Sequence, residues 1–337
     1  MTVLVTGGCG FIGSHTIVDL LENGYDVVSI DNNSRSNPAI LNGVFEITGK
    51  RIVNYVVDLR DVEATRRVFE ENKIDGIIHF AAFKSVDESV NHPILYFDNN
   101  LVSQINIMKI AAAFNVQNFV FSSSCSVYGN ASECPVTENT ILQKAESPYG
   151  RTKQIGEDMI TDTAKVSNGG FIILRYFNPV GAHPSIKIGE VPFGRPSNLF
   201  PAITQFAAGK LAELKVYGTD YDTRDGSCIR DFIHVSDIAH AHTLALNFLL
   251  ANNRYSNCEI FNLGTGNGVT VLEALRAFEE ATKKKLNYSL AGRRPGDVVA
   301  VYANNDKARS ILQWQPKYDL NEMMRTAWLW ESKQVSL

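Results

Sequence analysis

The stretch Thr2-Val-Leu-Val-Thr-Gly-Gly-Cys-Gly-Phe-Ile-Gly13 decides the fold. A short β-branched run is followed at once by Gly7, Gly10 and Gly13 and then by an apolar segment with helical spacing. Glycine at these positions permits a tight turn, a close approach of a pyrophosphate to the backbone, and close packing of helix on strand. The N-terminus of that helix offers free N–H groups and a partial positive charge. The stretch therefore predicts the strand, turn and helix that open a dinucleotide-binding domain.

The same alternation of short β-branched runs and longer helical patterns continues through the first half of the chain. It is typical of βαβ units and a parallel sheet. We expect strands at residues 2–6, 27–31, 52–57, 76–80, 119–123 and 171–177. We expect helices at residues 11–22, 62–72 and 94–114, and one that carries Tyr149 and Lys153. The fold class is therefore α/β, a Rossmann-type doubly wound parallel sheet.

From Pro179 the pattern becomes less regular, and residues 181–198 are rich in Gly, Pro and Ser. So long an irregular connection is uncommon unless it is functional. Beyond it we expect a helix at 199–208, strands at 214–217 and 259–263, and helices at 271–282 and 320–331. The predicted domains are a dinucleotide-binding domain at 1–180, which includes the Tyr149 helix, and a smaller mixed α/β substrate domain at 181–337. Some chain crossing between the two is expected.

Composition excludes several classes of protein. The chain of 337 residues is 45% hydrophobic and 20% charged, which is ordinary for a soluble globular protein. With 32 basic and 36 acidic residues the net charge is −4, so no global field attracts nucleic acid or an anionic membrane. No apolar run approaches the roughly 20 residues that span a bilayer. The opening residues lack the charged region and cleavage site of a signal peptide, and we expect a cytoplasmic protein.

The cysteines and histidines carry no ligand pattern. Five scattered cysteines form no Cys-x-x-Cys pair, and the seven histidines show no metal-binding spacing. We therefore expect neither a disulfide framework nor a metal site.

Tyr149 and Lys153 stand four residues apart in Ser147-Pro-Tyr-Gly-Arg-Thr-Lys153, about one helical turn, so both side chains share one helix face. Ser147 is a good N-cap, and Pro148 suits the first turn. A phenol titrates near ~10, and acting as a base at neutral pH requires a shift worth about 4 kcal/mol. A positive charge about 5 Å away supplies roughly 3 kcal/mol. A chance spacing remains the alternative for this pair taken alone.

Three further residues follow predicted strands, at the edge where open α/β sheets bind ligands. Asp31 can accept from both ribose hydroxyls and would repel a 2′-phosphate, so NAD is favoured over NADP. Asp58 is a weaker candidate for the adenine edge, and a plain turn role is nearly as good an explanation. Ser124 closes Ser122-Ser-Ser124 and can bind a substrate hydroxyl, although a solvated serine is the simpler interpretation.

Taken together, these features resemble the extended short-chain dehydrogenase/reductase superfamily and, within it, the UDP-hexose 4-epimerases, nearly end to end. In the first half the resemblance rests on Val5-Thr-Gly-Gly-Cys-Gly-Phe-Ile-Gly-Ser-His15, His79-Phe-Ala-Ala-Phe-Lys84, Asp98-Asn-Asn100, Phe121-Ser-Ser-Ser124, Val127-Tyr-Gly129 and Tyr149 to Lys153. In the second half it rests on Arg175-Tyr-Phe-Asn-Pro-Val-Gly-Ala-His183, Asn198-Leu199, Arg230-Asp-Phe-Ile-His-Val-Ser-Asp237, Asn262-Leu-Gly264 and Arg293-Arg-Pro-Gly-Asp297.

The resemblance implies an enzyme that keeps NAD bound, removes hydride from C4 of a UDP-sugar, lets the 4-keto sugar rotate, and returns the hydride to its other face. Tyr149 would be the base, Lys153 would lower its pKa and anchor the nicotinamide ribose, and Ser124 would orient the hydroxyl. The implied cofactor residues are Gly7, Gly10, Phe11, Ile12, Gly13, Asp31, Asn32, Asp58, Leu59, Phe80, Ala81, Lys84, Asn99, Ser122, Tyr149, Lys153 and Tyr176. The implied substrate residues are Lys84, Ser124, Tyr149, Phe177, Asn178, Asn198, Leu199, Val216, Tyr217, Arg230, Arg294, Asp297 and Val301.

Related activities differ in their site residues. The similar 4,6-dehydratases carry an acidic pair where this chain has Cys125 and Ser126, which cannot do that acid/base work at ordinary pKa. A UDP-glucuronate 4-epimerase, or another nucleotide-sugar short-chain dehydrogenase, shares the catalytic trio and stays open. A non-catalytic NAD-sensing regulator should have lost Tyr149 or Lys153.

Two finer expectations also come from the resemblance. Val301 takes the place of a bulky tyrosine that crowds an N-acetyl group, so we expect activity on UDP-glucose and UDP-galactose and on both UDP-N-acetylhexosamines. A simple core role for Val301 is the alternative, since Tyr302 is its neighbour. A homodimer through helix 94–114 and the Tyr149 helix is expected, although apolar helix faces there could equally be core. Neither the physiological sugar nor the kinetics follow from the sequence.

Overall fold

The computed structural model describes residues 1–194, 196, 198–251, 256–294 and 297–335. Its centre is a seven-stranded sheet in the order β11-β6-β5-β4-β1-β2-β3, with every neighbouring pair parallel. The strands are β1 Thr2–Thr6, β2 Asp26–Ile30, β3 Val53–Tyr55, β4 Gly76–His79, β5 Asn118–Ser122, β6 Gly170–Tyr176 and β11 Cys258–Leu263. The strand order reverses between β1 and β4, where doubly wound sheets bind their ligands. The predicted Rossmann-type α/β fold is confirmed.

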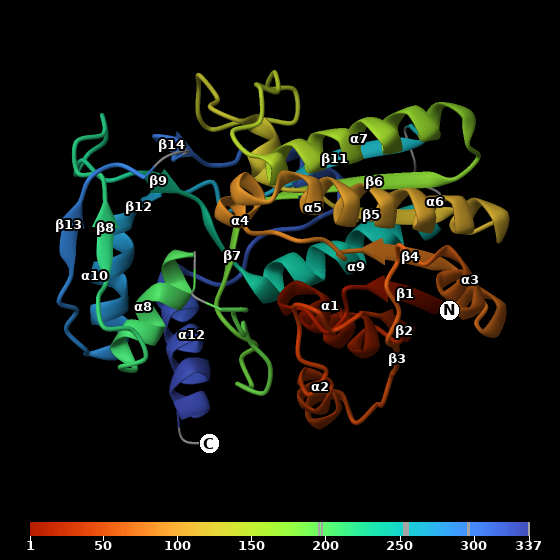
Figure 1. Cartoon of the computed structure of the whole chain (residues 1–337), viewed down its shortest axis with the longest axis horizontal. Helices are drawn as coiled ribbons and strands as arrows, with labels where there is room; N and C mark the ends of the chain where they lie inside the picture. Colours follow the sequence, from red (N-terminus) through yellow and green to blue (C-terminus); the bar gives the residue numbers. More distant parts are fainter. Residues whose placement is uncertain (195, 197, 252–255, 295–296, 336–337) are drawn as a thin grey trace.

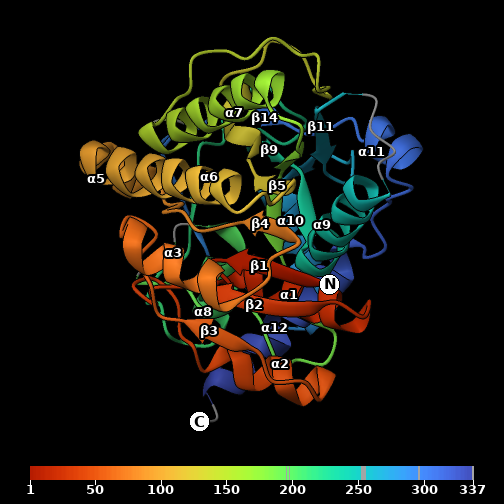
Figure 2. The same ribbon diagram turned by 90° about the vertical axis from the view of Figure 1, so that its right-hand side faces the viewer.

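Helices cover both faces of this sheet (Figures 1 and 2). One face carries α1 Phe11–Glu22, α2 Ile40–Thr48 and α9 Val235–Leu250. The other face carries α3 Val62–Glu71, α6 Ser103–Ala113 and α7 Pro148–Val166. Neighbouring residues of β1 show the arrangement, because Val3 and Val5 pack in the first core and Leu4 packs in the second. Strands buried on both faces explain the nearly continuous apolar runs in the sequence.

A smaller part of the molecule lies at the left of Figure 1. Its core joins Phe200, Phe232, Phe278 and Met324. Its helices are α8 Leu199–Ala207, α10 Val271–Thr282 and α12 Leu320–Val335. Its strands form two small sheets, β8 Lys215–Tyr217 with β13 Ser289–Ala291, and β9 Ile229–Arg230 with β12 Val269–Thr270 and β14 Ala300–Val301. Further elements are α4 Val86–Asn91, α11 Asp306–Ile311, the 3₁₀ turn η2 Cys125–Tyr128, and β7 Asn178–Val180 paired with β10 Phe232–His234.

For one strand, the sequence pattern predicted the wrong part of the molecule. The segment 259–263 was expected in the smaller part, but β11 pairs with β6 at the edge of the central sheet, with Ile260 opposite Ile173. Helix α9, which the sequence did not predict, also packs on that sheet. Local patterns reveal a strand but not its partner, which here lies far away in the chain. The chain therefore crosses between the two parts, and the boundary near residue 180 stays a prediction.

The expected helix 94–114 is interrupted. It consists of α5 Pro93–Phe97, a π-helical turn Asp98–Val102 and α6. In this turn Asn100 faces inward, where its Oδ1 accepts from Phe83 N at 2.8 Å and its Nδ2 donates to Phe83 O at 3.1 Å. Such a π-turn often marks a functional site. Here it fixes the loop that follows β4. No described helix is long and apolar enough to cross a membrane.

Candidate functional site

The glycine loop between β1 and α1 leaves no room for side chains. Gly7 has φ +73°, and a Cβ there would stand 3.0 Å from the backbone nitrogen of Ala81. A Cβ on Gly13 would overlap the carbonyl oxygen of Gly7, and one on Gly8 would meet the Ser29 hydroxyl. The requirement at Gly8 was missed by the sequence analysis. The loop thus brings bare backbone against the end of β4.

Helix α1 starts directly after this loop. Its N-cap is Gly10, and no side chain of the described residues caps this helix end. The first turn, with Phe11 and Ile12, therefore leaves its N–H groups to another partner, since the first N–H groups of a helix have no acceptor within it. This combination of a bare loop and an open helix N-terminus fits a pyrophosphate.

Asp31 follows β2 beside the glycine loop. Its carboxylate accepts from Cys9 N at 3.0 Å, Asn33 N at 2.9 Å and the Ser36 hydroxyl at 2.8 Å. These bonds fix the carboxylate at the carboxyl edge of the sheet, one strand from the pyrophosphate site.

The neighbouring Asp58 belongs to a small polar group. Asn32 Nδ2 donates to Asp58 Oδ2 at 3.2 Å, and Arg60 Nη2 donates to the same oxygen at 2.8 Å. Hydrogen bonds from Arg60 lower the pKa of Asp58 to about 2. Leu59 is buried next to it. Asp58 thus stays ionised and is already paired with a cation.

The segment after β4 lies against β1. Phe80 N donates to Thr6 O at 3.1 Å, and Ala81 N donates to the Thr6 hydroxyl at 3.3 Å. Further on, Lys84 forms an ion pair with Glu190 at 2.9 Å. Glu190 comes from the irregular connection after β7 and was not singled out by the sequence analysis. The predicted cofactor residues of β1, β2 and β4 therefore meet at one sheet edge.

Asn99 is buried in the π-helical turn beside this segment. Its Nδ2 donates to Asn100 Oδ1 at 2.9 Å. Asn100 in turn donates to the Thr152 hydroxyl at 3.1 Å. The turn thus links the loop after β4 to helix α7.

Helix α7 carries Tyr149 and Lys153 as predicted. Ser147 caps it by accepting from Gly150 N at 3.1 Å, and Pro148 occupies its first turn. The Lys153 ammonium lies 6.0 Å from the centre of the Tyr149 ring. The helical spacing does bring the phenol and the ammonium together.

Ser122 and Ser124 at the end of β5 contact this pair. Lys153 Nζ donates to the Ser122 carbonyl oxygen at 2.7 Å. The Ser122 hydroxyl also bonds the Tyr176 hydroxyl, and the Ser124 side chain hydrogen-bonds Tyr149. Serine, tyrosine and lysine therefore converge on one point at the carboxyl edge of the sheet.

Burial changes the protonation of this pair in a direction that the sequence analysis did not foresee. Burial raises the pKa of Tyr149 to about 12, although the hydrogen bond from Ser124 lowers it. Burial likewise lowers the pKa of Lys153 to about 8, against the opposing charge of Glu157. Residue spacing gives no measure of desolvation, which penalises both charged forms. Lys153 alone therefore does not make Tyr149 a base at neutral pH.

The two positions that are acidic in 4,6-dehydratases are unsuited to proton transfer here. Burial raises the pKa of the Cys125 thiol to about 11. The Ser126 hydroxyl is buried and has no hydrogen-bond partner among the described residues.

Several substrate residues predicted from the second half of the chain also lie close together. Arg230 Nη2 approaches Asp297 Oδ1 at 3.3 Å, and Arg230 pairs in register with Val301 between β9 and β14. Val301 is 5% exposed and shares a small apolar cluster with Phe177. Arg294 forms an ion pair with Asp87 of α4, from the other part of the molecule. The motif residues Pro295 and Gly296 lie outside the described residues.

Asn178 has an unusual environment. It follows the β6 end, and its Oδ1 is buried without a hydrogen-bond partner among the described residues. A buried acceptor without a donor is unfavourable unless a ligand supplies one.

Four other predicted residues sit on separate elements. Asn198 and Leu199 begin α8, while Val216 and Tyr217 belong to β8. Leu199 and Val216 pack in the core of the smaller part, whereas Tyr217 is exposed.

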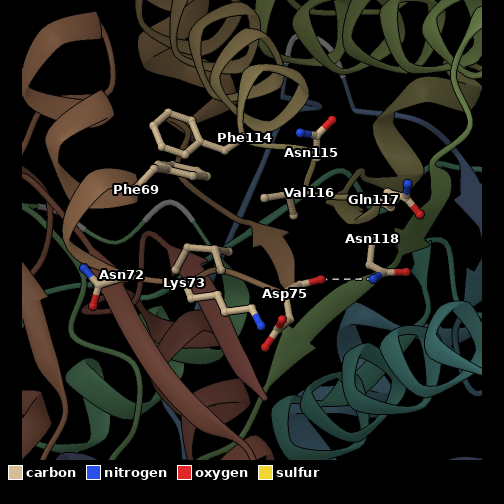
Figure 3. A pocket seen from close by; sticks show the side chains of 10 residues that line it. Phe69, Asn72, Lys73, Asp75, Phe114, Asn115, Val116, Gln117 and Asn118 are labelled. Carbon is tan, nitrogen blue, oxygen red and sulfur yellow. Dashed lines mark hydrogen bonds between the residues drawn. The ribbon is translucent and has the colours of Figure 1, made fainter.

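A separate hollow of about 350 Å³ opens at the opposite edge of the sheet (Figure 3). Its lining includes Phe69 at the end of α3, Phe114 after α6, and Asn118 at the start of β5. Asn118 Nδ2 donates to the backbone oxygen of Asp75 at 2.9 Å across its floor. These are the amino ends of the strands, so the hollow is not part of the site formed by the glycine loop and the serines.

Comparisons with known proteins agree with this geometry. A profile of the GDP-mannose 4,6 dehydratase family matches residues 4–327. UDP-glucose 4-epimerase 2 of Arabidopsis thaliana is 48% identical over 335 residues, covering 98% of this chain and 95% of the relative. The UDP-glucose 4-epimerase of Bacillus subtilis is 46% identical over 337 residues, covering 100% and 98%. Among solved structures, UDP-glucose 4-epimerase from Bifidobacterium longum in complex with NAD+ and UDP superposes with a TM-score of 0.95 at 44% identity, covering 99% and 98%.

Proposed function

The chain belongs to the family of UDP-glucose 4-epimerases, and we propose how its own residues carry out that reaction. It is an NAD-dependent enzyme that interconverts UDP-hexoses at C4. The alternative activity on UDP-glucuronate is not favoured by these relatives. The observation that carries the assignment of roles is the convergence of Ser124, Tyr149 and Lys153 beside the glycine loop.

NAD fits the residues at the sheet edge. The bare loop around Gly7 and the open N-terminus of α1 would receive the pyrophosphate, and Asp31 would accept from the adenosine ribose. Lys153 would bind the nicotinamide ribose. When bound, oxidised NAD accepts the hydride from C4 and adds a positive charge that disappears on reduction.

Tyr149 is the proposed base that takes the proton of the 4-hydroxyl, and Ser124 orients that hydroxyl. Because burial raises the pKa of Tyr149 to about 12, one ammonium is insufficient to ionise it at neutral pH. A second positive charge near the phenol is needed, and it must be present only before the sugar is oxidised at C4. Tyr149 then holds the proton on its oxygen until the ketone is reduced again. Proton and hydride transfer are thereby linked.

UDP is proposed to bind along the second half of the chain. Arg230 and Arg294 suit a diphosphate, since guanidinium groups form paired charge-assisted hydrogen bonds with it. The Oδ1 of Asn178, which has no hydrogen-bond partner among the described residues, supports a donor from the ligand at that point. We assign Phe177, Asn198, Leu199, Val216, Tyr217 and Asp297 to the same site.

Dual activity on the N-acetylated sugars is a further part of the proposal. We base it on the valine at 301, which packs with Phe177 and Tyr128 in an apolar cluster where a tyrosine would add a phenol ring. Room for the acetamido group at C2 follows from that missing ring. UDP-N-acetylglucosamine and UDP-N-acetylgalactosamine are therefore expected substrates.

A homodimer is proposed through α5, α6 and α7, which lie side by side in Figures 1 and 2. The apolar side chain of Ile94 on α5 is 76% exposed, and that of Val90 on the adjoining α4 is 59% exposed. Such exposed apolar groups favour burial against a second copy. We also place the enzyme in the cytoplasm.

The test of the reaction begins with the protein as purified. An absorbance spectrum should show copurified nucleotide, and UDP-galactose should yield UDP-glucose without any added NAD. Tyr149→Phe, which keeps the ring and removes the hydroxyl, should lose at least ~1,000-fold in turnover, within the range of acid/base contributions. Turnover that consumes stoichiometric added NAD, or yields an oxidised sugar as the product, would contradict this function.

A further inference from the structure

Glu157 occupies the next turn of α7 after Lys153, and it is buried. Its Oε1 accepts from the Ser123 hydroxyl at 2.5 Å and from Arg175 Nε at 3.0 Å. Its Oε2 accepts from Arg175 Nη2 at 2.6 Å. A buried carboxylate and guanidinium therefore form a forked ion pair directly beneath the catalytic turn.

The end of β5 ties this ion pair to the catalytic residues. Ser122, Ser123 and Ser124 bind the side chains of Lys153, Glu157 and Tyr149 respectively. Those three helix residues are spaced by four, so they form one row on the face of α7 that packs on β5. Each serine of the triplet thus fixes one member of the row.

We propose that Glu157 is a positioning residue for the epimerisation, because its carboxylate keeps the buried Lys153 ammonium protonated and in place. The inference rests on the roles proposed above for Tyr149 and Lys153. Neighbours four apart on a helix lie about 5–6 Å apart at Cβ, close enough for a strong charge interaction in a buried site. Arg175 pairs with the carboxylate through two guanidinium donors and limits how much of its charge acts on Lys153.

Other titratable groups around Lys153 and Glu157 are neutral. His79 on β4 faces Lys153, and burial lowers its pKa to about 3. Cys258 on β11 faces Glu157, and burial raises its pKa to about 11. Tyr149 and Tyr176 are phenols whose pKa values burial raises. The charge balance of the row therefore depends on Lys153, Glu157 and Arg175.

Burial and Glu157 act on Lys153 in opposite directions. Burial lowers the pKa of Lys153 to about 8, and the Glu157 carboxylate raises it. Without that carboxylate the ammonium loses its proton at lower pH, and the activity falls with it. Removing Arg175 leaves Glu157 uncompensated, which has the reverse effect. The two halves of one ion pair should therefore move the pH profile in opposite directions.

The experiment measures kcat/KM for UDP-galactose between pH 6 and 10 in four variants with their bound NAD. The alkaline limb of this pH profile is the range in which kcat/KM falls as Lys153 loses its proton. In Glu157→Gln this limb should move to lower pH by about one to two pH units. In Arg175→Gln it should move up. Glu157→Asp and Arg175→Lys keep the charges, and each should leave the limb within about half a pH unit of wild type.

A purely structural role predicts a different result, in which both neutral variants lose activity and the alkaline limb stays where it is. That outcome would overturn the proposal. If the single variants do not fold, Glu157→Gln/Arg175→Gln removes both buried charges together, and a downward shift smaller than about one pH unit is expected, since Glu157 is the nearer charge to Lys153. An unmoved limb in that double variant counts equally against the proposal. Should Lys153→Met retain full activity, the proposed roles of Tyr149 and Lys153 would fail first.

Discussion

Removal of the Lys153 charge is the most informative perturbation of the site. Lys153→Met keeps a buried apolar side chain of similar length and deletes the ammonium, which lies 6.0 Å from the centre of the Tyr149 ring. At an effective dielectric of about 20, one unit charge at that distance is worth about 2.8 kcal/mol, or roughly two pH units in the pKa of the phenol. The ionised fraction of Tyr149 at neutral pH should therefore fall about 100-fold.

The assay follows kcat for UDP-galactose against pH, with the tyrosinate absorbance recorded on the same NAD-loaded samples. We expect about 100-fold slower turnover at pH 7. A partial recovery of kcat should follow as pH rises, because a higher pH ionises the phenol without the ammonium. Lys165→Met is the matched control, since Lys165 is exposed on the same helix and pairs with Asp162. A loss below tenfold, or a tyrosine that titrates at its wild-type pH, would refute the electrostatic role of Lys153.

The same variant has a stability signature. Burial lowers the pKa of Lys153 from 10.5 to about 8, so its charged form is disfavoured in the folded state. This penalty is fully present below pH 8, where both folded and unfolded lysine are protonated, and it amounts to about 3 kcal/mol. Between pH 8 and 10.5 the penalty fades. Urea unfolding of the protein with bound NAD should show Lys153→Met more stable than wild type at pH 7 and the difference shrinking by pH 10; a destabilised variant at pH 7 would contradict the burial argument.

Three other predictions follow from single side chains. Gly7→Ala should lower copurified NAD at least ~10-fold by absorbance, because a Cβ at φ +73° would stand 3.0 Å from Ala81 N; wild-type NAD content would count against the loop. Val301→Tyr should abolish activity on UDP-N-acetylglucosamine and leave that on UDP-glucose within about threefold, and a wild type without N-acetyl activity would end the dual-substrate proposal. Ile94→Asp should convert the proposed homodimer to a monomer in light scattering, since it replaces an apolar side chain that is 76% exposed with a charged one; an unchanged mass would exclude this surface.

Local signals in the sequence predicted the first unit of the fold closely. Strand β1 and helix α1 begin and end at the expected residues, because the glycines mark the turn without any distant information. The Tyr149 helix also begins where Ser147 and Pro148 indicate. Both residues stand next to the first helical turn that they stabilise, so a local pattern is enough to predict where the helix begins.

Long-range packing explains what the sequence did not reveal. β11 lies next to β6, although α8, β8 and β9 of the smaller part intervene between them in the chain. The π-helical turn at Asp98–Val102 depends on the contact of Asn100 with Phe83. No periodicity in the sequence predicts either of these long-range contacts.

The sequence predicted that Tyr149 and Lys153 lie close together, but not how burial changes their pKa values. The spacing of Tyr149 and Lys153 gave their proximity correctly, because a helix turn is a local property. It could not give the burial that raises one pKa and lowers the other. Nor could it show that Glu157, one turn further on, meets Arg175 of β6. Desolvation and ion pairing between distant elements appear only when the chain is folded.

Transfer of the C4 hydrogen directly tests reversible oxidation at C4 with NAD kept bound. The purified protein is incubated with UDP-galactose that carries deuterium at C4, in ordinary water and with no added cofactor. We expect UDP-glucose with the deuterium retained at C4, because the hydride leaves and returns within one bound complex. Loss of the deuterium to solvent, or no UDP-glucose without added NAD, would contradict it.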